Sequence, residues 1–224
     1  MTYRIEDILR MVIPGLYLIT LCFILFAWIG WIDLSDNSTI RSLVASSFAN
    51  TLALLLPFIG FVIGYLINVI SSCIERMLYK CNMVTRPSAH VINGDDDYHI
   101  EEKQIKQIKE KLNLKDLDNV DNDHANKAFQ KAKEIMRKDE NINVFLAQSV
   151  LARNLAGCQI LFTLICLCTI CVNWRLSLCW IAGSLLLCLV MIYNWWRQRC
   201  VYAKYVFAAY GVTLNEKPTE GRQQ

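Results

Sequence analysis

Four long, uncharged apolar blocks constrain the fold of this sequence more than any other feature. They run over residues 11–32, 46–70, 155–172 and 176–196, and the second is densest at Leu52–Ile70. Crossing the hydrocarbon core of a bilayer, roughly 30 Å thick, takes about 20 helical residues, and each block reaches or nearly reaches this length. The sequence therefore predicts an all-α integral membrane protein with four transmembrane helices in two hairpins.

The composition agrees with this interpretation. Hydrophobic residues make up 54% of the chain and charged residues 19%, and the charges fall between and outside the blocks, as a bilayer requires. No block alternates apolar and polar residues as the strands of a membrane β-barrel do. The first block is longer than the roughly 7–15 apolar residues of a cleaved signal peptide. It ends at Trp28, Trp31 and Asp33, so we expect the protein to keep it.

Basic residues beside the blocks predict the orientation, because cytoplasmic flanks carry an excess of Lys and Arg. The two predicted outer links, 33–42 and 173–175, contain one Arg each. Four crossings place the other basic flanks on one side, namely Arg4, Arg10, Arg76, Lys80, Arg86, Arg153, Arg197, Arg199 and Lys204. We therefore predict a multi-pass protein of the plasma (inner) membrane with both termini and the middle segment in the cytoplasm.

The same interpretation divides the chain into five parts. These are an interfacial amphipathic start (1–10), the first hairpin (11–74), a cytoplasmic helical insert (75–152), the second hairpin (153–197), and an interfacial helix with a disordered tail (198–224). The interfacial helix is predicted from Tyr202, Tyr205 and Tyr210, which recur at helical spacing, because tyrosine suits the headgroup boundary.

The insert is predicted to contain two amphipathic helices. Apolar residues recur at helical spacing over 100–113 and over 124–139, with charged residues between them. Arg86-Pro87 and Asn93-Gly94 indicate an exposed linker before the first of these helices. Residues 144–152 are expected to lead into the third membrane helix as one continuous rod.

Two narrow apolar stripes cannot bury a sizeable core by themselves. They must pack on each other, on the membrane or on another subunit, and oligomerisation is the economical solution. We therefore predict a homo-oligomer in the lipid bilayer, with a protein partner at the insert and interfacial contacts through Ile105, Ile108, Phe129, Ile135 and Arg153. Residues 75–154 hold fourteen Lys plus Arg and fourteen Asp plus Glu. Because nucleic-acid-binding surfaces are strongly basic, no direct nucleic-acid binding is expected.

Small and polar residues inside the blocks indicate helix contacts. Gly60 and Gly64 form a G-x-x-x-G pattern, which permits close helix approach and predicts a packing face. Asn68 and Gln159 are amides in the second and third blocks. Each either bonds between helices or lines a water-filled path, and the sequence leaves both alternatives open.

No motif supplies a catalytic or metal centre. In Cys166-x-Cys168-x-x-Cys171, residues two apart on a helix point away from each other, which disfavours shared metal ligation. Asp121-Asn122-Asp123-His124 combines carboxylates with an imidazole, yet such clusters are usually solvated turns. Walker, H-E-x-x-H and G-x-S-x-G motifs are absent. We expect no enzyme activity, cofactor or metal.

The order of parts resembles small multi-helix membrane proteins of prokaryotic antiviral systems, either CRISPR-associated or nucleotide-signalled. The resemblance is carried by Ile13-Pro14-Gly15 at the first helix, the charged insert, and Ala152-Arg153-Asn154-Leu155 at the third helix. It implies a self-assembling effector that permeabilises or depolarises the host membrane. The chain departs from this resemblance in two ways. Gln159 stands where an R-N-x-x-x-x-H motif beginning at Arg153 would have its histidine, and no nucleotide-binding fold is recognisable.

These observations lead to one main hypothesis and two alternatives. The main hypothesis is a non-enzymatic oligomeric membrane effector in antiviral defence, which forms a pore or perturbs the membrane. The first alternative is a membrane scaffold or assembly factor that docks a partner through the insert. The second is a channel or transporter subunit.

Overall fold

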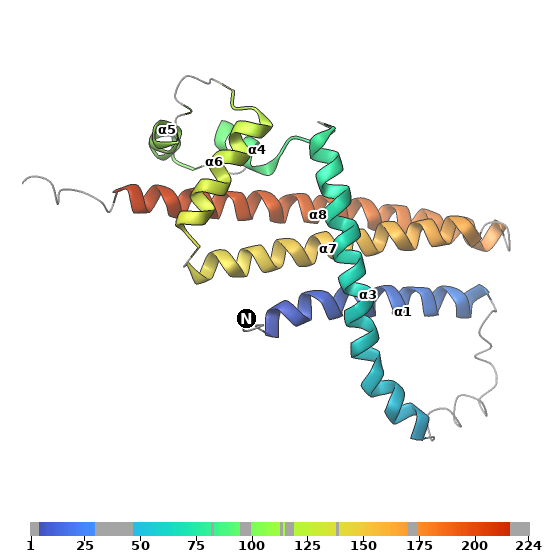
Figure 1. Ribbon diagram of the computed structural model, residues 1–224. Coiled ribbons are helices and arrows are strands. Elements are labelled where there is room, and N and C mark those ends of the chain that lie inside the picture. The colour runs from blue at the N-terminus through green and yellow to red at the C-terminus, as the bar shows by residue number, and fades with distance from the viewer. Residues whose placement is uncertain are drawn as a thin grey trace, which may run out of the picture. The chain divides into compact units, whose positions relative to one another are not determined.

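Seven helices make up the part of the chain that the computed structural model describes, which is residues 5–29, 47–81, 83–94, 100–112, 114, 119–137, 139–169 and 174–215. No strand occurs in these residues, which confirms the all-α prediction for them. The helices are α1 (Ile5–Ile29), α3 (Ser47–Lys80), α4 (Pro87–Asn93), α5 (Glu102–Lys111), α6 (Asn122–Ile135), α7 (Glu140–Cys168) and α8 (Trp174–Asn215) (Figure 1).

Four of these helices are long and apolar enough to cross a membrane. The candidate spans are Ile8–Ile29, Leu54–Lys80, Glu140–Cys168 and Leu178–Thr213, one for each predicted block. α7 runs unbroken through 144–152, as the sequence predicts. The four spans are consistent with a multi-pass membrane protein. The predicted outer link 33–42 lies outside the described residues, as does the predicted polar tail from residue 216 onward. Of the predicted link 173–175 only Asn173 lies outside them, because α8 begins at Trp174.

The chain divides into two compact units. The first unit comprises Met1–Ile74 and Val150–Trp195, and the second comprises Glu75–Ser149 and Trp196–Gln224. The unit boundaries fall inside α3, α7 and α8, so each of these helices contributes residues to both units.

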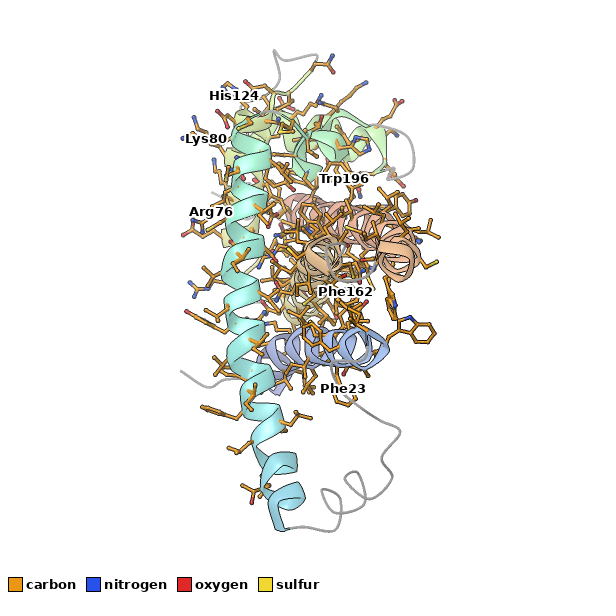
Figure 2. All side chains as sticks on the ribbon, turned by 90° about the vertical axis from the view of Figure 1, so that its right-hand side faces the viewer. Phe23, Arg76, Lys80, His124, Phe162 and Trp196 are labelled. Carbon is orange, nitrogen blue, oxygen red and sulfur yellow. The ribbon has the colours of Figure 1, made fainter. Side chains whose placement is uncertain are left out.

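Within the first unit, α3 crosses α1 and does not run alongside it as the predicted hairpin would (Figure 1, Figure 2). The helices meet at glycines, where a Cβ on Gly15 would overlap the backbone of Gly60 and a Cβ on Gly64 would overlap the carbonyl oxygen of Met11. Helices lacking Cβ atoms at a crossing can bring their backbones into contact. The structure therefore places both glycines of the G-x-x-x-G pattern at this crossing.

A second contact region of the first unit joins α1, α7 and α8. Leu25, Phe162, Cys166 and Ile181 are buried together there. The Trp180 ring packs edge-on against Phe162, with their centroids 6.3 Å apart. Cys166 is buried in this cluster whereas Cys168 is exposed, so the two thiols face different surroundings.

The second unit has an apolar core of its own, which the sequence did not predict. Buried residues of α4, α5, α6 and the start of α7 pack with the C-terminal part of α8. Phe129 of α6 places its ring edge-on against Tyr202 and Phe207, at centroid distances of 5.6 and 5.8 Å. The missing surface for the two amphipathic stripes therefore comes from α8 of the same chain.

This core changes the interpretation of residues 198–215. The sequence predicted a separate interfacial helix, but α8 continues without a break to Asn215. Tyr202 and Tyr210 are buried in the core of the second unit. Tyrosines at helical spacing suit either the headgroup boundary or a protein core. The two cases differ in whether another helix covers the tyrosines, and here α6 packs against Tyr202.

Residues 87–93 also differ from their prediction as a linker. They form α4, which has Pro87 in its first turn and Gly94 as its left-handed C-cap with φ 78°. Pro at a helix start and Gly just after its end are helix boundary signals as well as turn signals. Between them Val91 and Ile92 are buried, so the segment is part of the core.

Candidate functional site

A network of buried polar side chains links three apolar helices of the first unit. The Tyr17 hydroxyl of α1 donates to Gln159 Oε1 of α7 at 2.8 Å. Gln159 Nε2 donates to Ser184 Oγ of α8 at 3.0 Å and to the Ser184 carbonyl at 3.3 Å. Gln159 itself is fully buried. The amide therefore acts as a polar tie between α1, α7 and α8.

Thr163 extends this network by one helical turn. Its hydroxyl donates to the carbonyl of Gln159 at 2.8 Å and lies 2.6 Å from Ser184 Oγ. Because Gln159 and Thr163 are four residues apart, both fall on the face of α7 that meets α8. Polar groups in an apolar interior need partners, and here the helices supply them.

A cavity of about 350 Å³ opens beside this network. It is lined by Leu21 and Trp28 of α1, Gln159 and Phe162 of α7, and Cys179, Trp180, Gly183, Ser184 and Leu187 of α8. Its walls are apolar apart from the end formed by Gln159 and Ser184. Pockets of this size and character hold small, mainly apolar ligands with one hydrogen-bonding group. None of the lining residues is a carboxylate or an imidazole.

The predicted amide Asn68 also has a protein partner. Arg153 Nη2 of α7 donates to Asn68 Oδ1 of α3 at 2.5 Å. One residue further along α7, Asn154 Nδ2 donates to the carbonyl of Arg10 at 3.4 Å. Asn68 and Gln159 thus both take part in bonds between helices, the first of the two alternatives that the sequence left open.

Of the predicted interfacial residues on the insert, three belong to the core of the second unit. Ile108 is buried, and Ile105 and Phe129 are partly buried against it. Only Ile135 stays on the surface, with 53% of its area exposed. Sequence reasoning assigned these residues to an outside partner because their spacing does not reveal that α8 returns to cover them.

The acidic segment before α6 caps that helix. Asp121 Oδ1 accepts hydrogen bonds from the His124 backbone N–H at 2.8 Å and from His124 Nδ1 at 2.7 Å. These bonds, the backbone one first, lower the pKa of the Asp121 carboxyl. The described residues contain no group of three or more His, Cys, Asp or Glu side chains able to hold a metal. A second segment that combines aspartates with a histidine, Asp95-Asp96-Asp97-Tyr98-His99, lies outside those residues.

Three residues of this network, Tyr17, Thr163 and Ser184, were not predicted from the sequence. Each is a hydroxyl in an apolar helix, which is a signal for a bond between helices. The partner of each is set by the relative rotation of helices far apart in the sequence, which spacing within one helix does not specify. No protein-family model matches the chain, and no curated protein and no solved structure is significantly similar to it.

Proposed function

We propose that the chain is a non-enzymatic membrane effector that acts as an assembly of several copies and permeabilises the bilayer. The observation that carries this proposal is the N-terminal half of α3. Six consecutive residues, Leu54–Ile59, are exposed on every side of the helix, with 81% of Leu54 and 65% of Phe58 accessible. A helix that packs on its own chain buries one face, so the described part of this chain covers no face of this segment.

The buried polar side chains of the first unit favour a water path that runs between copies of the chain over one that runs through a single copy. In the described part of the first unit, Gln159, Thr163 and Ser184 bond to one another and are buried. Opening a water path through a single chain would break these bonds in an apolar interior, which is costly. In an assembly, contacts along α3 leave this network intact.

Oligomeric state and leakage together test the proposal. The full chain is purified in detergent, its mass is measured, and dye release is followed after reconstitution into liposomes. We expect an oligomer and leakage. Replacing Leu54 and Phe58 together by alanine should shift the mass towards the monomer and reduce leakage. The matched control is Leu186→Ala on α8, a residue with comparable exposure that should leave both unchanged.

Lipid alone would also cover the exposed segment of α3, and the same experiment separates that case. A strict monomer that leaves the liposomes tight overturns the proposal. Equal effects of the α3 and α8 substitutions would also contradict the role given to α3. The antiviral setting stays a prediction from the resemblance of the sequence.

A membrane scaffold is the second candidate, and the core of the second unit favours it. Sixteen buried apolar residues form that core, so this part of the chain is a folded module able to present a docking surface. Exposed Ile135 and Met83 belong to its surface. An oligomer or monomer that binds a protein partner through this unit without any dye leakage would favour the scaffold over the effector.

A further inference from the structure

A group of charged and aromatic side chains in the second unit has no role in the proposed function. These side chains come from the end of α3, from the residue before α4, from α6 and from the C-terminal half of α8. We call it the basic cluster, and its members are Glu75, Tyr79, Arg86, Lys133, Arg199 and Tyr202.

Direct contacts join two pairs of its members, Arg199 with Glu75 and Arg86 with Tyr79. Arg199 Nη2 and Glu75 Oε2 form an ion pair at 2.7 Å, with both side chains largely buried. The Arg86 guanidinium lies over the Tyr79 ring, 5.1 Å from its centroid, a cation–π contact. Arg199 also acts electrostatically on Lys133 and Tyr202.

The basic cluster carries more positive than negative charge. Arg86, Lys133 and Arg199 are cations, and Glu75 is the carboxylate among its members. Burial and the nearby Arg199 lower the pKa of Lys133, which shows that its charged form is disfavoured there. Partly buried cations at close range are costly unless an anion compensates them.

Four buried polar atoms in the cluster have no hydrogen-bond partner among the residues that the structure describes. They are Arg86 Nε, Arg199 Nε and the hydroxyl oxygens of Tyr79 and Tyr202. The two tyrosines expose 9% and 2% of their surface, so they do not reach bulk water. Each group can donate a hydrogen bond. Such buried groups normally have partners, and their spare donors call for an acceptor.

Phosphate is the anion whose chemistry fits this set. Its unprotonated oxygens accept hydrogen bonds, and arginine binds them through paired hydrogen bonds. Arg86 and Lys133 are only half-buried and so give the cluster access to the surface. In the sequence, Glu75 comes five residues after the end of the second apolar block, and Arg199 comes three residues after the end of the fourth. Basic pockets at such positions bind lipid headgroups.

We propose that the basic cluster binds a phosphate group, which Arg86 and Lys133 hold by charge and Tyr79 and Tyr202 by hydrogen bonds. The phosphate belongs either to a phospholipid headgroup or to a soluble phosphate compound. Arg199 positions the site through its ion pair with Glu75.

Two sets of binding measurements on the full chain separate these sources. In nanodiscs, the thermal midpoint of unfolding is compared between phosphatidylcholine alone and phosphatidylcholine with phosphatidylglycerol. In detergent, inorganic phosphate and pyrophosphate are titrated, with chloride at equal ionic strength as control. Stabilisation by phosphatidylglycerol alone assigns a lipid, and stabilisation by the soluble anions assigns a soluble ligand. No stabilisation in either arm overturns the proposal.

Matched variants test the assignment of residues. Lys133→Gln should weaken anion binding about tenfold, the size of one charge-assisted hydrogen bond, whereas Lys131→Gln on the exposed face of α6 should not. The double variant Tyr79→Phe, Tyr202→Phe removes two unpartnered hydroxyls. It should fold at least as well as the wild-type protein without anion, yet bind the anion more weakly. Tyr205→Phe is its control. Unchanged anion affinity in both test variants would contradict the proposal.

Discussion

The crossing of α1 and α3 makes a sharp prediction about Gly64. A Cβ at this position would overlap the carbonyl oxygen of Met11, which is a backbone atom and cannot rotate away. The Gly64→Ala variant must therefore push the two helices apart and lose contacts around Gly15 and Gly60. Forcing one methyl group into a close-packed contact costs about 1–3 kcal/mol. Because the obstacle is backbone, we expect the upper part of that range.

Gly183→Ala provides the matched control. Gly183 also lies inside an apolar helix, but a Cβ there meets nothing within 4 Å. Both substitutions gain the same helix propensity, about 0.5–1 kcal/mol in a soluble helix. Subtracting one variant from the other removes this gain and leaves the cost of the crossing. Gly64→Ala should therefore be about 2–3 kcal/mol less stable than Gly183→Ala.

Reversible unfolding in mixed detergent micelles, titrated with SDS and followed by tryptophan fluorescence, measures both free energies. Gly15→Ala offers an independent check, because its Cβ would overlap the backbone of Gly60 at the same crossing. The double variant of Gly15 and Gly64 should cost less than the sum of the two, since one separation relieves both overlaps. Equal stability of Gly64→Ala and Gly183→Ala would refute the close contact of α1 and α3.

Three other predictions concern the polar tie, the cavity and the cap of α6. Gln159→Met removes three hydrogen bonds to Tyr17 and Ser184. At roughly 0.6 kcal/mol for each bond, the variant should lose about 2 kcal/mol of unfolding free energy in the same SDS titration. Unchanged stability would contradict the role of Gln159 as a tie between helices. We expect a lipid acyl chain to occupy the cavity beside Trp28 and Trp180, because its walls are mainly apolar. Gly183→Leu should fill the cavity and lower the quenching of tryptophan fluorescence by brominated lipid, whereas unchanged quenching would contradict an acyl chain in the cavity. The pKa of Asp121 is lowered on folding, so its stabilising effect should be complete above its unfolded pKa near 3.8 and disappear as pH falls through the folded value. Asp121→Asn should retain the cap and abolish this part of the pH dependence of thermal unfolding, and a pH dependence identical to the wild type would contradict it.

The placement of the four long apolar helices follows from the sequence alone. Their length and lack of charge are local properties, and a segment that leaves water must form its own backbone hydrogen bonds. The continuity of α7 is also a local property, because 144–152 contains no helix-breaking residue. Gly60, Gly64, Asn68 and Gln159 could be singled out because two glycines one turn apart and amide side chains often mark contacts between such helices.

Only the tertiary structure decided which surfaces meet. Phe129 and Ile108 were predicted to need an outside partner, and Tyr202 and Tyr210 to lie at the headgroups, yet all four share one core. Helical spacing defines an apolar face but not the face that covers it. The contact of Gly64 with Met11 and the bonds of Gln159 to Tyr17 and Ser184 depend in the same way on the rotation and crossing of helices far apart in the sequence. The sequence thus determined which segments leave water, and packing between distant segments determined what each of them touches.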